Sequence, residues 1–209
     1  MSPNEPYMTI AKPTVEEDIL LSWGAAYKKV NKGDIIFMEG GQACFYYQLV
    51  KGRVRWVNIN EDGREFIQVM IEEGESFGEL PLFDEMPYAA TAIADEDSIV
   101  LRLCKSHFHQ MVRSSYDIHF NFTRLLVERL RFKFLTLKEI AYNNPEQRIS
   151  NLLRYYKRNT SIGDKLVKLQ YTRQQIADMT GLRVETVIRT IRNLHERGAL
   201  KIQRGKVFF

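Results

Sequence analysis

Hydrophobic and polar positions alternate in short runs between Lys29 and about Leu103, and glycines separate one run from the next. Asp62-Gly63 joins two such runs, and this dipeptide favours the tight turn of a β-hairpin. Many short strands separated by glycine turns predict a β-sandwich or a jelly-roll barrel. We expect short helices to flank this barrel, over Val15–Tyr27 before it and over Lys105–Arg113 after it.

The pattern changes from Ser115 to about Tyr142, where apolar residues recur at helical spacing and neither proline nor glycine occurs. The recurring positions are Ile118, Phe122, Leu126, Leu130, Leu137 and Ala141. We therefore predict one long helix, ended by Asn143-Asn144-Pro145. More apolar residues lie on its other faces, namely Phe120, Leu125, Phe132 and Phe134. Such a helix needs two packing partners, which we expect to be its own barrel and the same helix of a second copy. One large intramolecular core is the alternative.

A third pattern, TRQQIADMTGLRVETVIRTIR from Thr172 to Arg192, predicts two short helices joined by a tight turn. Thr172 can cap the first helix, and Gln175 completes a capping box with it. Gly181 falls where the turn between the helices requires a positive φ. The apolar residues that face inward are Ile176, Ala177, Leu182, Val187 and Ile191. The charged residues of the second helix face outward, as in a helix-turn-helix.

A helix over Gln147–Lys157 and a short β segment over Leu166–Leu169 precede this motif, and ALKIQRGKVFF follows it. The last segment predicts two short strands about the basic turn Arg204-Gly205-Lys206. A hairpin in this place is the wing of a winged helix, with its tip positioned to touch phosphates. We therefore expect double-stranded DNA as a partner of the C-terminal part.

The charge distribution supports this expectation. Residues 147–209 hold 14 Lys and Arg against 4 Asp and Glu, a net charge of +10, whereas residues 1–146 hold 16 against 22, a net charge of −6. Neutralisation of phosphates by Lys and Arg supplies most of the non-specific affinity for DNA. An acidic N-terminal part would be repelled by the duplex and would help to orient the molecule.

The residues expected to touch DNA come from both helices and the wing: Thr172, Arg173, Gln174, Arg183, Glu185, Thr186, Arg189 and Lys206. Arg189 is suited to donate two hydrogen bonds to guanine, and Glu185 can accept one from cytosine N4. Glu185 can also hold the Arg189 guanidinium in place four residues on, although an ordinary surface pair is the alternative. The residues expected to bind phosphates and set the register are Thr172, Arg173, Gln174, Thr186 and Lys206.

Composition narrows the classes of protein to which the chain can belong. The chain of 209 residues is 44% hydrophobic and 27% charged, as in soluble globular proteins, and can hold one large or two small domains. No apolar run approaches the ~20 residues that cross a bilayer, and the start resembles no secretory signal. Cys44 and Cys104 are too few and too far apart for a zinc or iron–sulfur site, so we expect buried free thiols in a reducing cytoplasm, with no metal and no membrane partner.

The order of a barrel, a long helix and a winged helix-turn-helix resembles the catabolite activator protein and fumarate–nitrate regulator (Crp/Fnr) family of bacterial transcription factors. The segments that carry this resemblance are KGRVRW, FGELPLF and TRQQIADMTGLRVETVIR. The resemblance implies an α+β fold with a cyclic-nucleotide-binding-like β jelly-roll sensor (residues 1–114), a dimerisation helix and hinge (115–143) and a winged helix-turn-helix domain (144–209). It also implies a homodimer on a two-fold operator, RNA polymerase as a further partner, and no enzymatic activity.

Two departures from the family pattern concern specificity. Val184 stands where catabolite-activator-type members have an arginine, and Ile188 stands where the fumarate–nitrate type has a serine, so the operator preference should shift. Cyclic-AMP-binding members follow FGEL with an Arg-Ser pair that holds the phosphate, whereas Ala89-Ala90 fall there in this chain. Loss of that guanidinium costs roughly 3–5 kcal/mol, or a ~10²–10³-fold or greater loss of affinity. We therefore expect no tight cyclic AMP binding and assign no cofactor.

The candidate effector pocket comes from the FGEL segment, the Ala-Ala segment and the long helix: Gly78, Glu79, Leu80, Tyr88, Ala89, Ala90, Lys133 and Phe134. Lys133-Phe134 replace the Thr-Ser pair that touches adenine in cyclic AMP binders. Lys133 could rescue an anion, which keeps open a cyclic nucleotide sensor with a non-standard phosphate site. The apolar members could bind a hydrophobic effector or simply fill the barrel.

Two rival functions come from other classes. His107 and His109 suggest a metal-dependent jelly-roll enzyme, but Lys105–Arg113 is expected to be a helix, which would turn the two rings ~200° apart, and no acidic third ligand follows nearby. The other rival is an effector-binding module whose basic tail recruits a protein partner instead of DNA.

Overall fold

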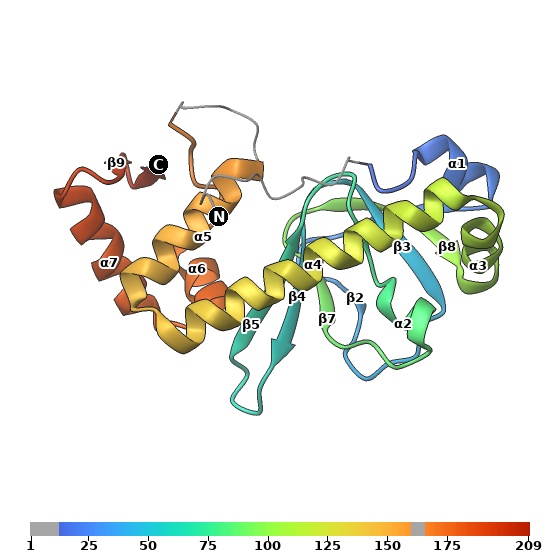
Figure 1. Ribbon diagram of the computed structural model, residues 1–209, viewed down its shortest axis with the longest axis horizontal. Coiled ribbons are helices and arrows are strands. Elements are labelled where there is room, and N and C mark those ends of the chain that lie inside the picture. The colour runs from blue at the N-terminus through green and yellow to red at the C-terminus, as the bar shows by residue number, and fades with distance from the viewer. Residues whose placement is uncertain (1–12, 160–165) are drawn as a thin grey trace, which may run out of the picture. The chain divides into compact units, whose positions relative to one another are not determined.

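The computed structural model describes residues 13–159 and 166–209, and the chain divides into two compact units, one ending at Glu128 and the other beginning at Arg129 (Figure 1). Helix α4 (Tyr116–Tyr142) contributes residues to both units. The long helix predicted from Ser115 to about Tyr142 is confirmed, and it begins one residue later than expected. No helix within the described ranges combines the length and the apolar character that crossing a bilayer requires.

The first unit contains two four-stranded antiparallel sheets. One sheet has the order β1 (Ala26–Val30), β8 (Ser98–Cys104), β3 (Phe45–Lys51) and β6 (Ser76–Phe77). The other has the order β2 (Ile35–Phe37), β7 (Thr91–Ala94), β4 (Val54–Ile59) and β5 (Glu65–Ile71). Most neighbours in each sheet are distant in sequence, which is the crossover pattern of a jelly roll. The predicted jelly roll is confirmed.

The β4–β5 pair is the hairpin that Asp62-Gly63 predicts. Its register runs from Val54 opposite Ile71 to Ile59 opposite Glu65, with one irregularity between Trp56 and Val57. Gly63 has φ +75°, a conformation that glycine adopts without steric cost, so the turn dipeptide determines the local geometry as expected.

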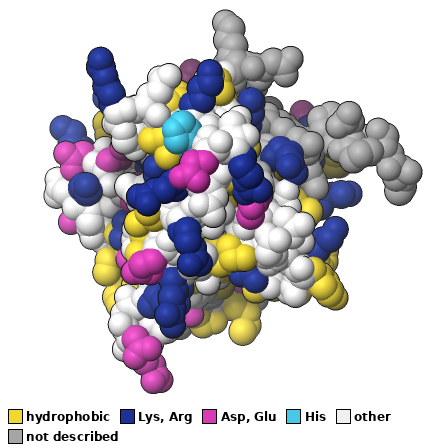
Figure 2. Space-filling view, turned by 90° about the vertical axis from the view of Figure 1, so that its left-hand side faces the viewer, with side chains coloured by type: hydrophobic (Ala, Val, Ile, Leu, Met, Phe, Trp, Pro, Cys, Tyr) yellow, Lys and Arg dark blue, Asp and Glu magenta, His cyan; other side chains and the backbone are white. Residues whose placement is uncertain are grey.

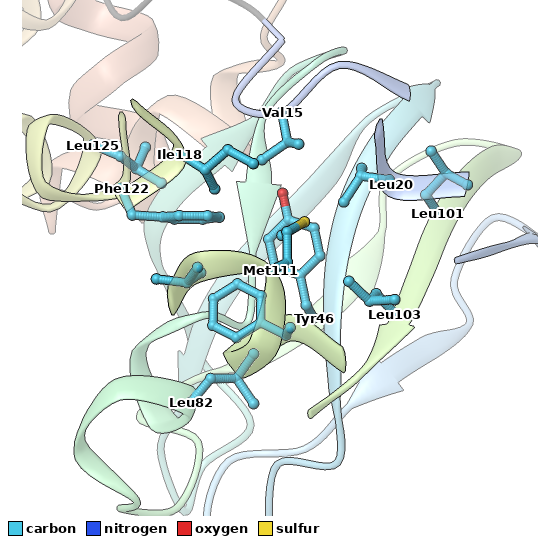
Figure 3. Packing of buried hydrophobic residues seen from close by; sticks show 12 residues of the cluster. Val15, Leu20, Tyr46, Leu82, Leu101, Leu103, Met111, Ile118, Phe122 and Leu125 are labelled. Carbon is cyan, nitrogen blue, oxygen red and sulfur yellow. The ribbon is translucent and has the colours of Figure 1, made fainter. Parts of the chain in front are cut away.

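Two apolar clusters hold the first unit together. One fills the space between the sheets, and its members include Phe37, Tyr47, Trp56, Phe77 and Tyr88. The other lies between the β1–β8–β3–β6 sheet and helices α3 (Lys105–Ser114) and α4, and Figure 3 shows how its side chains converge around Tyr46. The first half of α4 is thereby fixed to the sensor sheet.

The helix predicted over Val15–Tyr27 is wrong in its second half. Helix α1 spans only Glu17–Ser22, and Gly24 follows it with φ +87°. From Ala26 the chain becomes strand β1, whose five residues pair with β8. The sequence predicted a longer helix, but the residues from Ala26 to Val30 pair with the edge of β8, and backbone hydrogen bonding to that edge determines the outcome.

The second unit contains helices α5 (Pro145–Asn159), α6 (Arg173–Thr180) and α7 (Val184–Glu196), followed by strands β9 (Lys201–Gln203) and β10 (Lys206–Phe208). Pro145 is the first residue of α5, where its missing N–H leaves no hydrogen bond unmade. The predicted β segment at Leu166–Leu169 is reduced to one isolated bridge, between Lys168 and Phe208, with backbone hydrogen bonds on either side of it.

Candidate functional site

Helix α6 begins with the capping box that the sequence predicts. The Gln175 N–H donates to the Thr172 hydroxyl at 3.1 Å, and the Thr172 N–H donates to the Gln175 side-chain oxygen at 2.8 Å. The helix ends at Gly181, whose φ of +68° is the left-handed conformation expected there. The Leu182 N–H then donates to the Ala177 carbonyl at 3.1 Å, which starts the turn toward α7. Both ends of the short helix are therefore set by local hydrogen bonds.

Helix α7 separates its apolar and polar faces. Val187 and Ile191 are at most 1% exposed, whereas Arg183, Glu185 and Arg189 are exposed. Glu185 and Arg189 lie on one side of the helix because a spacing of four residues is about one helical turn. Figure 2, turned toward the side on which α7 lies in Figure 1, shows more Lys and Arg than acidic side chains on this face. Such a surface fits a polyanion.

The predicted contacts on α6 differ in their surroundings. Thr172 and Gln174 are exposed, and the Gln174 amide donates to the Asp178 carboxylate at 2.8 Å. Arg173 is partly buried, and burial lowers the pKa of its guanidinium. Thr186 on α7 is also partly buried. Gln174 is therefore held in one orientation by Asp178, a positioning contact that the sequence analysis did not anticipate.

The wing is the β9–β10 hairpin, with Gln203 opposite Lys206. Arg204 and Gly205 occupy its turn with φ of +48° and +75°, and Lys206 is exposed beside them. The hairpin is anchored by hydrogen bonds between Val167 and Phe209, at 2.8 and 3.0 Å. The predicted basic hairpin is confirmed as a structure.

A single arginine, missed by the sequence analysis, ties the helices of this unit together. The Arg148 guanidinium donates to the carbonyls of Ile140 at 2.8 Å, Asn143 at 3.0 Å and Thr180 at 3.4 Å. These acceptors lie in the last turns of α4, just after α4, and at the end of α6. Carbonyls at helix C-termini carry partial negative charge, so a guanidinium is a favourable partner for them. The sequence signal that could have indicated this role is a basic residue shortly after Asn144-Pro145.

The FGEL segment lies at the edge of the sensor barrel. Gly78 has φ +76°, and a Cβ atom there would lie 2.9 Å from the Phe37 ring, so the position requires glycine. Glu79 follows with no exposed surface and precedes the short helix α2 (Leu80–Asp84). The barrel therefore holds the Glu79 carboxylate in its interior rather than at its surface.

Aromatic rings fill the barrel beside this segment. The rings of Phe37 and Tyr88 stack with centroids 3.8 Å apart and planes 9° apart, and Phe37 also contacts Tyr47 and Phe77. Burial raises the pKa of the Tyr88 hydroxyl well above its ordinary value. Ala89 is exposed and Ala90 is buried, and neither side chain offers a polar atom. The protein's own aromatic side chains therefore occupy part of the barrel interior.

The other two candidate pocket residues, Lys133 and Phe134, lie on α4 in the second unit. Lys133 is partly buried, and burial together with the positive charge of Arg129 lowers the pKa of its ammonium group to about 8. Phe134 is 62% exposed. The structure brings Gly78, Glu79 and Tyr88 into one barrel and leaves Phe134 at the surface of its helix.

The cysteines correct one expectation. Both are free thiols, but Cys44 is exposed and Cys104 is partly exposed, so the prediction of buried thiols is wrong. Cys104 ends β8 and caps α3, and Cys44 lies just before β3, so both are at ends of strands where the core no longer covers them. His107 and His109 lie on α3, as the sequence predicts. Residues 13–159 and 166–209 contain no group of three His, Cys, Asp or Glu side chains that could hold a metal ion.

A β jelly roll, a long helix and a capped helix-turn-helix with a basic wing define a class of DNA-binding transcription regulators that carry a sensor domain. Comparison with family models finds the cyclic nucleotide-binding domain over residues 27–115 and the Crp-like helix-turn-helix domain over residues 147–208. The chain belongs to the Crp/Fnr family, whose members are transcription regulators and not enzymes.

Individual relatives agree with this assignment. The chain is 28% identical over 176 residues to the cyclic AMP receptor protein of Thermus thermophilus, covering 84% of this chain and 80% of that protein. It is 25% identical over 199 residues to the cAMP-activated global transcriptional regulator CRP of Escherichia coli, covering 92% and 94%. The solved structure of FixK2 from Bradyrhizobium japonicum has the same fold, with a TM-score of 0.77, 23% identity, and coverage of 88% and 92%.

Proposed function

We propose that the chain acts as a homodimer that recognises a two-fold operator and that its sensor barrel does not bind cyclic AMP tightly. The proposed dimer is supported by an apolar stripe on α4, defined as Val127, Leu130, Phe134 and Leu137. These four side chains are 46%, 55%, 62% and 62% exposed. Their spacing of three, four and three residues is the a/d repeat of a coiled coil. A second α4 packed along this stripe would bury these side chains.

Pairing of two copies through α4 would give the protein two α7 helices related by a two-fold axis. Helix-turn-helix dimers of this kind bind half-sites whose centres lie one helical turn of DNA apart, about 34 Å. RNA polymerase as a partner and the cytoplasm as location follow from the family alone and stay predictions.

The DNA contacts are assigned by exposure and chemistry. Arg189 and Glu185 are exposed on the same face of α7, where one can donate to guanine and the other can accept from cytosine. The other proposed contacts are Thr172, Arg173 and Gln174 at the start of α6, Arg183 and Thr186 at the start of α7, and Lys206 in the wing. Arg189→Ala should weaken specific binding by ~1–3 kcal/mol and relax the choice at one base pair. Unchanged operator footprints with this variant would refute the assignment of Arg189.

The dimer is tested by light scattering of the purified full chain with and without DNA. Phe134→Lys places a charge in the centre of the stripe, whereas Tyr142→Lys makes a similar change at an 83%-exposed position of α4 outside the a/d repeat. We expect Phe134→Lys to be monomeric and to lose operator binding, and Tyr142→Lys to behave as the wild type. A dimeric Phe134→Lys protein, or a wild type that is monomeric on DNA, would overturn the proposal.

Weak cyclic AMP binding is supported by the barrel itself. Neither Ala89 nor Ala90 supplies a cation, and the stacked rings of Phe37 and Tyr88 occupy the adjacent interior. The buried Glu79 carboxylate adds negative charge, which opposes a phosphodiester nearby. Calorimetry should therefore find no sub-micromolar dissociation constant for cyclic AMP, and such a constant would refute this part of the proposal.

A further inference from the structure

A cavity lies inside the unit that begins at Arg129, which is the unit that carries the helix-turn-helix. It has a volume of about 440 Å³ and is lined by the second half of α4, by α5 and by the end of α6. Small-molecule sites in proteins usually have volumes of about 300–1,000 Å³. The cavity is therefore large enough to hold a small organic ligand.

Two contacts hold the walls of this cavity together. In the first, the rings of Phe132 on α4 and Tyr155 on α5 lie 4.5 Å apart between their centroids. In the second, the Arg148 guanidinium on α5 donates to the carbonyls of Ile140 and Thr180. The two contacts are separated by seven or eight residues along each helix, which corresponds to roughly 10–12 Å. Helices α4 and α5 are thus fixed to each other at two points about two turns apart.

Apolar side chains face the space between these two contacts. Leu135 on α4 and Leu152 on α5 lie at intermediate positions and line the cavity, and Met179 at the end of α6 is also part of its wall. Both leucines keep part of their surface exposed. Covering exposed apolar surface with another apolar group is favourable. The cavity therefore favours a ligand with an apolar body.

The proposed dimer leaves this cavity open. At 100° per residue, Phe132, Leu135 and Glu139 lie roughly 120–180° around α4 from the centre of the apolar stripe. A second α4 packed along the stripe is therefore on the other side of the helix. Within the described ranges, the residues that line the cavity include none of those proposed to contact DNA. A ligand in the cavity thus displaces neither the partner helix nor these contacts.

The charged side chains around the cavity are mostly basic. They are Lys138, Arg148 and Arg154 against Glu139, a net charge of +2. The Glu139 carboxylate already accepts a hydrogen bond from the Asn143 amide, and Arg148 donates to backbone carbonyls. Lys138 and Arg154 are exposed, and within the described chain Lys138 forms no ion pair and Arg154 donates one hydrogen bond within α5. Two cations are therefore available at the mouth of the cavity.

We propose that this cavity is a binding site for a small amphipathic organic anion, which consists of an apolar body and one acidic group. The acidic group accepts hydrogen bonds from Lys138 and Arg154 at the mouth, and the apolar body packs against Leu135 and Leu152. Such a ligand contacts α4, α5 and α6 at once, the same helices that Arg148 ties together. Its binding therefore stabilises their arrangement. The site is separate from the sensor barrel and from the proposed dimer interface.

The test uses the full chain and two carboxylates, sodium octanoate for a straight-chain body and sodium 1-naphthoate for a flat aromatic body. The alcohols 1-octanol and 1-naphthalenemethanol are their uncharged counterparts. Calorimetry measures affinity, and the methyl resonance of Met179 reports binding at the cavity, with the buried Met111 of the sensor unit as the reference. We expect at least one carboxylate to bind at up to millimolar concentration and to shift Met179 but not Met111. It should bind about 4- to 25-fold more tightly than its alcohol, because two exposed cations contribute.

Variants locate the binding. Lys138→Gln should weaken binding of the carboxylate about 2- to 5-fold, and the double variant with Arg154→Gln about 4- to 25-fold. Arg131→Gln removes an exposed arginine of α4 that does not line the cavity, and it should bind as the wild type does. Leu135→Trp fills the cavity and should abolish measurable binding. Tyr142→Trp introduces the same side chain at an exposed position of α4 outside the cavity and should leave binding unchanged.

Hydrogen exchange shows whether the ligand holds the three helices together. A ligand that binds only the closed arrangement slows local opening about tenfold at ten times its dissociation constant. We expect this slowing in peptides from α5 and α6, and no change in peptides from β3 and β8. Binding without slower exchange in α5 and α6 would contradict the proposed site.

The proposal is overturned if neither carboxylate shifts Met179, or if each alcohol binds as tightly as its carboxylate. It is also overturned if the Lys138→Gln and Arg154→Gln double variant binds as tightly as Arg131→Gln. If exchange in α5 to α7 shows that Leu135→Trp does not fold, the charge variants decide. Mobility shifts on DNA are measured in parallel. Failure of the wild type to bind DNA, with the carboxylate still bound, would contradict the proposed function and leave the cavity site intact.

Discussion

Replacement of Arg148 by Met tests whether one side chain ties the DNA-binding unit together. The change keeps most of the aliphatic stem and removes three donors, to the carbonyls of Ile140, Asn143 and Thr180. Hydrogen bonds from charged groups contribute about 1.5–3 kcal/mol each. Arg148 is partly exposed, and its contact with Thr180 is long at 3.4 Å, so we expect a total loss of about 2–4 kcal/mol.

The assay has to report on this unit alone. Both tryptophans of the chain, Trp23 and Trp56, lie in the other unit, so their fluorescence does not report its unfolding. Hydrogen exchange of peptides from α5 to α7, read by mass spectrometry, measures the local free energy of opening. We expect faster exchange in these helices and unchanged exchange in β3 and β8.

The matched control is Arg154→Met on the same helix. Arg154 is exposed, and its guanidinium donates a hydrogen bond to the side-chain oxygen Oδ1 of Asn151 at 2.7 Å within α5. We expect it to cost less than about 0.5 kcal/mol, as is usual for surface positions. Equal exchange in Arg148→Met and Arg154→Met would refute the tying role of Arg148.

Four further changes test other parts of the structure. Lys206→Ala should flatten the salt dependence of DNA affinity by about one unit of slope, as titrations at several salt concentrations would show; an unchanged slope would remove the wing from the phosphate contacts. Thr172→Ala should cost about 1 kcal/mol of stability in α6, measured by hydrogen exchange, and no change would mean that the cap contributes nothing. Lys133 has a pKa of about 8 in the folded chain, below its ordinary value, so its protonation opposes folding fully below about pH 8, and this effect declines as the pH rises from about 8 to about 10.5. The stability difference between Lys133→Met and wild type should therefore shrink from pH 8 to pH 10.5, and a constant difference in urea titrations would contradict it. A hydrogen bond from Ser106 lowers the pKa of the Cys104 thiol, so Ser106→Ala should slow alkylation of Cys104 at neutral pH; an unchanged rate by mass spectrometry would exclude this effect.

Local hydrogen bonding explains what the sequence could predict. Three features depend only on residues a few positions apart, so short sequence patterns are enough to predict them. They are the capping box of Thr172, the positive φ of Gly181 and the hairpin at Gly63. The long helix was predictable for the same reason, since its spacing is uninterrupted from Tyr116 to Tyr142.

Contacts between distant residues explain what the sequence could not predict. Strand β1 forms because β8 offers an edge some seventy residues later, and the Ala26 opposite Arg102 pairing has no local pattern. Arg148 reaches Thr180 across 32 residues, and Arg102 meets Phe45 only after β3 and β8 pair. The candidate pocket was identified from the FGEL segment, whereas Arg102, which pairs with Tyr47 on the inner face of the sensor sheet, belongs to strand β8.

Helix α4 passes from one compact unit to the other without a break at Glu128 or Arg129. An α-helix turns by 100° for every residue, so the number of residues along α4 fixes the angular phase between its sensor-bound half and its apolar stripe. Gain or loss of one residue in the middle of α4 would turn Phe134 and Leu137 away from the side they now occupy. Insertions or deletions in α4 should therefore preserve the dimer only in steps that restore this phase, close to whole heptads.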